Sequence, residues 1–171
     1  MLVKTVGLAA MVFASTSFAD VSAFKLTLGK TTVEEAQQTY WLTPTGQNSA
    51  SKGPMFSVAP DAIDFPNIQG FNLVFSQNNT LSAIHITLPR TEFADVRPML
   101  SQRYTVVAEQ LPFVGNRRVT YEKDGVQIEL NSPHLSFETT LLYATDEFHE
   151  QVEVMMKEYE TALQQQRARA L

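Results

Sequence analysis

Hydrophobic and polar residues alternate most regularly between positions 71 and 88. Two apolar runs, Phe71 to Phe75 and Leu81 to Leu88, flank the turn-forming segment Gln77 to Thr80. In the second run the two phases hold different side chains: Ile84, Ile86 and Leu88 in one, His85 and Thr87 in the other. This pattern predicts a β-hairpin with one buried and one polar face.

A second hairpin is predicted around Asp124-Gly125, because this dipeptide favours a tight two-residue turn. Its strands are Arg118 to Glu122 and Val126 to Leu130, and in the latter Gln127 and Glu129 occupy the polar phase. Three more runs predict strands: Phe24 to Leu28, Met55 to Ala59 and Leu135 to Ala144. We expect the polar segment from Thr43 to Pro54 to be a mobile loop.

Helical spacing of apolar residues appears three times. Thr32 and Glu35 form a capping box that begins the first helix. Residues 91–104 predict a second helix, and Pro98 favours a regular start near Asp95 with that side chain as the cap. The third helix covers residues 146–169 and has the longest apolar stripe: Phe148, Val152, Met155, Met156, Tyr159 and Leu163.

The order of these elements repeats, since a helix precedes a small antiparallel meander in residues 24–88 and again in 91–144. One helix over three or four strands buries little surface alone, so we expect the two units to share a core. The sequence therefore predicts an α+β domain over residues 20–145. It has an antiparallel sheet with helices on one face, and an amphipathic C-terminal helix (146–171) that packs on it.

The first nineteen residues have the composition of a secretory signal peptide. Lys4 precedes a short apolar run, and small residues occupy Ser17 and Ala19. We expect cleavage after Ala19 and a periplasmic or secreted location in a bacterium. The chain has no cysteine, which excludes disulfides and a lipid-modified cysteine at that site. No other stretch predicts a membrane span.

Charge narrows the range of partners. The formal net charge of the chain is −5, and Lys4 is the only charged residue before Asp20, so the remainder carries −6. An acidic chain whose basic residues are scattered does not favour binding to nucleic acid or to an anionic membrane surface. Another envelope or secreted protein fits better, while the oligomeric state is not determined by these observations.

One stretch resembles a known group of exported domains. Leu28 to Ala36 is similar to the L-G-x-T/S-x-x-E-V/A opening of many exported bacterial domains, and Phe71 to Ile86 is similar to their following hairpin. The group includes the β-lactamase inhibitor protein and the small lipoprotein subunit of the outer-membrane β-barrel assembly machine. The resemblance implies helices on one sheet face and a second face open to a protein partner. The long C-terminal helix and the absent lipidation cysteine depart from this pattern.

The residues show no recognisable catalytic, cofactor or metal constellation. His85, His134 and His149 are not spaced as a metal pair, and neither a nucleophile elbow nor a glycine-rich phosphate loop occurs. Asp61 and Asp64 flank irregular chain, where turn formation is one interpretation and cation binding another.

The function expected from these observations is a non-catalytic protein-binding module, in one form an inhibitor or immunity protein. The candidate contacts are the polar residues of two predicted strands: His85, Thr87, Gln127 and Glu129. One alternative is a carrier or sensor of a lipid, sugar or peptide, with a pocket between the sheet and the C-terminal helix. The other is an unrecognised hydrolase.

Overall fold

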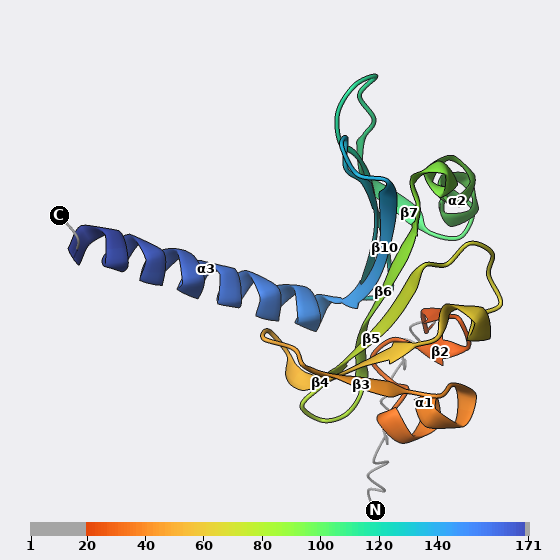
Figure 1. Cartoon of the computed structure of the whole chain (residues 1–171), viewed down its shortest axis with the longest axis horizontal. Coiled ribbons are helices and arrows are strands. Elements are labelled where there is room, and N and C mark those ends of the chain that lie inside the picture. The colour runs from red at the N-terminus through yellow and green to blue at the C-terminus, as the bar shows by residue number, and fades with distance from the viewer. Residues whose placement is uncertain (1–19, 170–171) are drawn as a thin grey trace, which may run out of the picture.

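One eight-stranded antiparallel sheet organises the chain. The structure, a computed structural model, describes residues 20–169, and the strand order across the sheet is β3-β4-β5-β6-β10-β9-β8-β7 (Figure 1). Its strands are β3 (Thr43–Gln47), β4 (Lys52–Val58), β5 (Gly70–Ser76), β6 (Leu81–Pro89), β7 (Thr105–Gln110), β8 (Arg117–Lys123), β9 (Val126–Ser132) and β10 (Glu138–Thr145). The helices are α1 (Val33–Thr39), α2 (Phe93–Ser101) and α3 (Asp146–Arg169), with 3₁₀ turns at Pro60–Ala62 and Arg90–Glu92. A two-stranded hairpin, β1 (Ser22–Ala23) and β2 (Leu26–Thr27), lies outside the main sheet.

The sheet has two similar halves, each a helix followed by a four-stranded meander. In each half the first strand lies at the sheet edge and the last at the centre, where β6 pairs with β10 from Pro89↔Glu138 to Ala83↔Ala144. The predicted fold class is confirmed: α+β, with an antiparallel sheet, α1 and α2 on one face and a long C-terminal helix. The signal peptide predicted for residues 1–19 lies outside the described residues.

Sequence signals and structure agree at the first helix and at the second hairpin. The Thr32 side chain accepts from the Glu35 N–H at 3.2 Å, and the Glu35 carboxylate accepts from the Thr32 N–H at 2.9 Å. Asp124 and Gly125 both have positive φ, 48° and 75°, as a two-residue type I′ turn requires.

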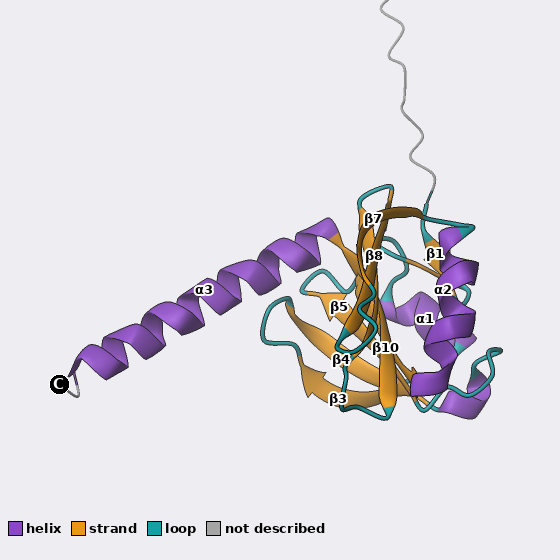
Figure 2. Ribbon diagram, turned by 90° about the horizontal axis from the view of Figure 1, so that it is seen from above, coloured by secondary structure: helices purple, strands orange, loops and turns teal. Residues whose placement is uncertain are grey.

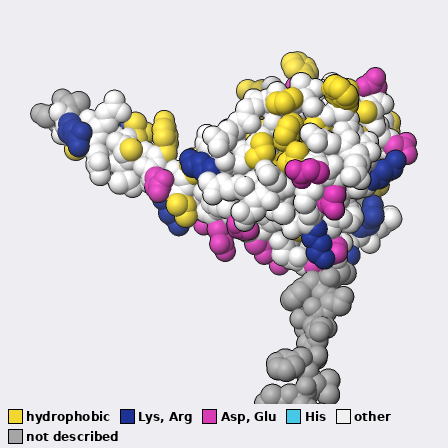
Figure 3. All heavy atoms as spheres, turned by 90° about the horizontal axis from the view of Figure 1, so that it is seen from below, with side chains coloured by type: hydrophobic (Ala, Val, Ile, Leu, Met, Phe, Trp, Pro, Cys, Tyr) yellow, Lys and Arg dark blue, Asp and Glu magenta, His cyan; other side chains and the backbone are white. Residues whose placement is uncertain are grey.

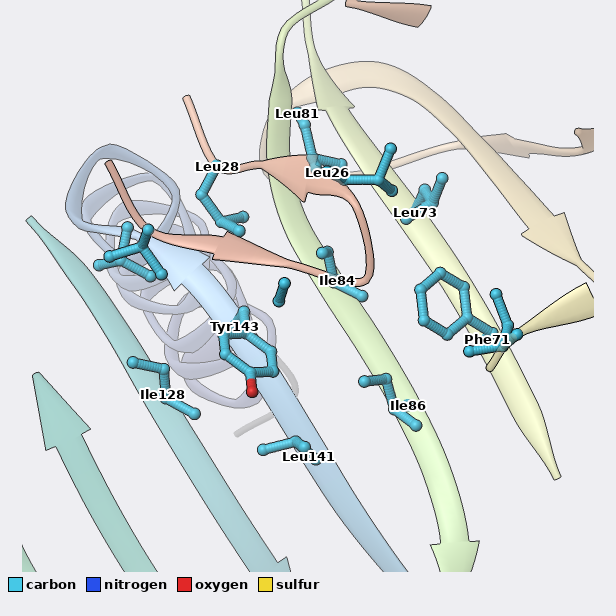
Figure 4. Close-up of a cluster of buried hydrophobic side chains, with 14 of the residues drawn as sticks. Leu26, Leu28, Phe71, Leu73, Leu81, Ile84, Ile86, Ile128, Leu141 and Tyr143 are labelled. Carbon is cyan, nitrogen blue, oxygen red and sulfur yellow. The ribbon is translucent and has the colours of Figure 1, made fainter. Parts of the chain in front are cut away.

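The main core lies between the sheet and the layer formed by α1, α2 and the β1–β2 hairpin. The aliphatic phase of each central strand points into it, as the alternation predicts, and Figure 4 shows Ile84, Ile86, Ile128 and Leu141 on this face. Its largest fully buried side chains are Tyr121, Phe71, Phe75, Leu26, Leu73, Leu81, Ile84, Ile86, Leu88, Ile128, Leu130 and Val119.

The second helix is stabilised by packing rather than by a cap. The prediction of a start near Asp95 is wrong: α2 begins at Phe93, directly after the 3₁₀ turn, and has no side-chain cap. Pro98 lies inside the helix, where it has no N–H to donate. The ring of Phe93 is buried with the Arg117 guanidinium 4.4 Å from its centroid, and the Tyr121 hydroxyl donates to the Arg97 carbonyl at 3.1 Å.

Both edge strands differ from the prediction. The segment predicted as a loop, Thr43 to Pro54, contains β3 and the beginning of β4, and no strand was predicted over β7. Every residue of β3 and of β7 is exposed, so neither strand has a buried face that would impose an alternating pattern. Backbone pairing with β4 and β8 defines them instead.

Two predicted strands also have different limits. Phe24 to Leu28 is not one strand, because Phe24 and Lys25 form the turn between β1 and β2 with φ values of 52° and 60°. The strand predicted from Leu135 begins only at Glu138. Leu135 and Phe137 are in a loop with exposed side chains, although their apolar character fits a strand.

Helix α3 leaves the sheet and projects away from the body (Figures 1 and 2). It has 24 residues, which corresponds to about 36 Å at 1.5 Å per residue. Of the α3 residues, Phe148 alone is buried. Packing of the predicted apolar stripe is therefore limited to the first turns of the helix. None of the helices in residues 20–169 is long and apolar enough to cross a membrane.

Candidate functional site

The sheet face opposite α1 and α2, here called the open face, carries the polar phase of the central strands. Because β-strand side chains alternate between faces, residues next to the buried aliphatic positions point here. They include Asn72, His85, Thr87, Thr120, Gln127, Glu129, Thr140 and Leu142, and all of them are half-buried.

All four predicted contact residues lie on the open face. The register places His85 opposite Leu142 of β10, and Leu142 in turn opposite Glu129 of β9. Thr87 is the next residue after His85 on this face of β6 and lies opposite Thr140. Gln127 of β9 lies opposite Ala144 of β10. The four residues thus form two pairs separated by β10. The strands β6 and β9 are two strand spacings apart, which corresponds to about 10 Å. The pair on β6 therefore does not contact the pair on β9.

Charge on the open face is concentrated on β8 and β9. The Arg118 guanidinium lies 3.4 Å from the Glu129 carboxylate, and both side chains are in part exposed. Burial lowers the pKa of His85, and the charge of Glu138 opposes this shift without reversing it. The centre of the open face therefore presents a neutral imidazole to a partner at neutral pH.

The base of α3 covers one end of the open face, over the central strands β5, β6 and β10. Phe148 packs with Val74, Ala83 and Ala144 in a small second cluster, and Val152 contacts its edge. The rest of α3 turns away from the sheet (Figure 2). The open face therefore remains accessible across its centre and toward β7.

A group of exposed apolar side chains lies on two loops at the end of the sheet farthest from α3. We call it the tip patch; its members are Phe113 and Val114 of the β7–β8 loop and Leu135 and Phe137 of the β9–β10 loop. Relative exposures are 105% for Phe113, 89% for Leu135 and 91% for Phe137. The β7–β8 loop extends beyond the strands in Figure 1.

Hydrogen bonds fix the β9–β10 loop and link it to its neighbour. The Arg90 guanidinium donates to the backbone carbonyls of His134 and Ser136, and the Arg90 N–H donates to the Phe137 carbonyl at 2.8 Å. The His134 N–H donates to the Asn116 side chain at 2.8 Å, which joins the two loops. The β9–β10 loop of the tip patch is thus held in place by the fold, and one hydrogen bond ties it to the end of the β7–β8 loop.

A cavity of about 330 Å³ lies on the other side of the sheet, where the two halves meet. We call it the junction cavity. The β1–β2 turn and α2 form its walls, and buried apolar side chains of α2 and β10 form its floor. The pocket expected between the sheet and the C-terminal helix is instead a shallow depression between α3 and the β3–β4 loop, lined by Lys52, Glu147, Glu150 and Glu158 among others.

The described residues show no grouping of three histidine, aspartate or glutamate side chains that could hold a metal ion. Asp64 instead lies at the rim of the junction cavity.

Fold and site together define an α+β protein with one accessible sheet face and an apolar patch at the end of that sheet. Comparison with protein-family models, curated proteins and solved structures found no match.

The sequence pattern does not predict the tip patch, because its residues fit other patterns. Leu135 and Phe137 continue the apolar phase of β10, so the sequence predicts that they belong to that strand. Phe113-Val114 lies between Pro112 and Gly115, and two large apolar residues enclosed by turn-forming residues are a sign of exposure. This signal identifies one loop; its proximity to the other depends on the strand pairing.

Proposed function

We propose that this protein is a non-catalytic protein-binding module of the bacterial envelope, which binds another envelope or secreted protein. The observation that carries the proposal is the tip patch: four large apolar side chains, exposed on two loops that a hydrogen bond joins. Exposed apolar groups of this kind mark interaction sites in folded proteins.

The energetics favour a protein partner with a complementary apolar surface. Complete burial of a side chain such as Phe or Leu contributes about 1.5–3 kcal/mol. The Arg90 hydrogen bonds order the β9–β10 loop before binding, so binding costs little conformational entropy in this loop. We therefore expect Phe113 and Phe137 to act as the main anchors.

The open face would add specificity next to these anchors. His85, Thr87, Gln127 and Glu129 offer neutral and charged hydrogen-bonding groups on a surface that no described helix covers at its centre. Hydrogen bonds to such a face discriminate between partners more than they increase affinity. An inhibitor or immunity protein is one form of this function, in which the partner is a hydrolase whose active site is covered.

The proposed location depends on the composition of residues 1–19, which suits a cleaved export signal. N-terminal sequencing of the protein isolated from its natural host tests this part independently. We expect Asp20 as the first residue. An intact N-terminus on protein recovered from the cytosol would contradict the proposed location.

Site-specific photo-crosslinking tests the partner surface. A photoreactive phenylalanine analogue replaces Phe113 in cells that naturally produce the protein, and the matched control replaces Tyr159 on α3, an aromatic residue that is 63% exposed. We expect one reproducible protein adduct from position 113 and none of the same mass from position 159.

Binding of the purified partner then tests the energetic role of each surface. Phe137→Ser on the tip patch and Thr87→Arg on the open face should each weaken binding at least tenfold, while Val154→Ser on α3 leaves it unchanged. The proposal is contradicted if no adduct forms at position 113, or if Phe137→Ser binds the partner as the wild-type protein does.

A further inference from the structure

The junction cavity is shaped by residues from both halves of the chain. Its floor contains Leu100 of α2 with Leu141 and Tyr143 of β10, all of them buried. Figure 4 shows Leu141 and Tyr143 along the same face of β10. A volume of about 330 Å³ lies in the range of small-molecule sites, which begins at about 300 Å³.

The wall on the N-terminal side is a turn in an unusual conformation. Phe24 and Lys25 both have positive φ, in a turn that favours asparagine and glycine. The Tyr40 hydroxyl donates to the Phe24 carbonyl at 2.9 Å and so holds the turn. The Phe24 ring meets Phe65 and Tyr143 edge to face, with centroid separations of 6.1 and 6.4 Å. Backbone strain of this kind often accompanies a binding site.

The interior of the cavity is apolar and aromatic. Tyr104 lies opposite the hairpin wall, with its ring centroid 6.1 Å from that of Tyr143. Burial raises the pKa of the Tyr143 hydroxyl, so this group stays neutral at physiological pH. An apolar chain could therefore enter the cavity without burying a charge.

The rim of the cavity carries more positive than negative charge. Lys25 and Arg103 lie there with exposed side chains, together with the carboxylate of Asp64. Within residues 20–169, neither Lys25 nor Arg103 belongs to one of the four ion pairs. Two cations beside an apolar cavity in an acidic protein match a ligand with an apolar chain and an anionic head.

We propose that the junction cavity binds a single-chain amphipathic anion of the size of a medium-chain fatty acid. The chain lies between Phe24, Phe65 and Tyr104, and the anionic head pairs with Arg103 and Lys25 at the rim. The site lies on the helical side of the sheet and is distinct from the open face and the tip patch. Its test is therefore independent of the proposed protein partner.

Titration calorimetry with three probes separates the contributions of chain and head. Dodecanoate, below its critical micelle concentration, has both; butanoate has the head with a short chain; dodecyltrimethylammonium has the chain with the opposite charge. We expect saturable binding of one dodecanoate per protein, with the other two at least tenfold weaker. The proposal is overturned if dodecanoate shows no saturable binding, or if either of the other probes binds as tightly.

Variants at the rim locate the site. Met99→Trp fills the mouth of the cavity from a position that is 54% exposed, and Arg103→Glu reverses a rim charge. Each should lower the affinity for dodecanoate at least tenfold. Lys25→Glu reverses the charge of the other rim cation and should have the same effect. Met156→Trp and Arg167→Glu make the same changes on α3 and should bind as the wild type does. Wild-type affinity in both Met99→Trp and Arg103→Glu would overturn the assignment.

Discussion

At the scale of single residues, Gly53 shows how closely two strands approach. A Cβ atom at this position would lie 2.0 Å from the Phe75 carbonyl oxygen and 2.4 Å from that of Ser76. The Ser51 hydroxyl donates to the same Phe75 carbonyl at 2.9 Å and accepts from the Gly53 N–H at 3.3 Å. The backbone of β4 therefore contacts β5 directly, with no room for a side chain.

The first prediction concerns this contact. Gly53→Ala should destabilise the fold by about 3 kcal/mol, because relief of the clash requires β4 to move away from β5. Gly70→Ala is the matched control, since its Cβ would meet Thr87 Oγ1 at an acceptable 3.4 Å. Urea unfolding measures both. Equal stability of the two variants would show that β4 adapts without cost.

The second prediction concerns His85, whose pKa is lowered mainly by burial. The unfolded chain then binds more protons than the folded one as the pH falls through the ordinary histidine range, so stability decreases with falling pH. His85→Gln should remove this contribution. Urea midpoints at pH 7.5 and pH 5 should therefore differ less in His85→Gln than in the wild type. His134→Gln, in an exposed loop, is the control, and an unchanged difference in His85→Gln would contradict the prediction.

At the scale of elements, α3 consists of two parts with different environments. Its first turns pack through Phe148 and Val152 against the open face, at one end of its central strands. From Glu158 to Arg169 every side chain except that of Leu163 is exposed. Figure 3 shows hydrophobic side chains on this projecting helix, away from the body of the molecule. Because these side chains are exposed, the rest of the fold contributes little to the stability of the distal part. An isolated helix is only marginally stable in water.

The third prediction compares how the proximal and distal parts of α3 contribute to the stability of the fold. Phe148→Ala should cost about 3 kcal/mol because it leaves a cavity among Val74, Ala83 and Ala144. Deletion of residues 158–171 should change the free energy of unfolding by less than about 0.5 kcal/mol. Chemical denaturation followed by circular dichroism measures both. A large loss of stability on deletion would mean that the distal helix has a structural partner, such as a second copy of the chain.

At the scale of the whole molecule, the two halves form one sheet and one main core. β6 and β10 pair along most of their length, and the main core contains residues of both halves, such as Phe71 and Ile128. Separation would expose the unpaired edge of β6 and part of the apolar face below the helices. Exposed edges of this kind promote aggregation.

The fourth prediction follows from this shared sheet. The intact protein should unfold in a single transition, with coincident near- and far-ultraviolet circular dichroism. Residues 20–89 expressed alone should not form a stable monomer. Two resolved transitions, or a folded monomeric first half with native-like amide dispersion in NMR spectra, would contradict the prediction.

Features that depend on local patterns can be predicted from the order of the amino acids. The capping box at Thr32, the Asp124-Gly125 turn and the alternation along β6 and β9 specify the central elements and the face on which each side chain lies. His85, Thr87, Gln127 and Glu129 accordingly lie on one polar face. Their role in partner binding remains a prediction.

Features that depend on pairing between distant segments arise only when the chain is folded. The exposed edge strands β3 and β7 have no buried face, so backbone hydrogen bonds to a neighbouring strand define them. The tip patch joins Phe113 and Phe137 through two loops, and the junction cavity joins Phe24 and Tyr104 across both halves. An apolar side chain has the same local signal whether it enters a core, lines a cavity or faces water, and the surrounding chain decides among these environments.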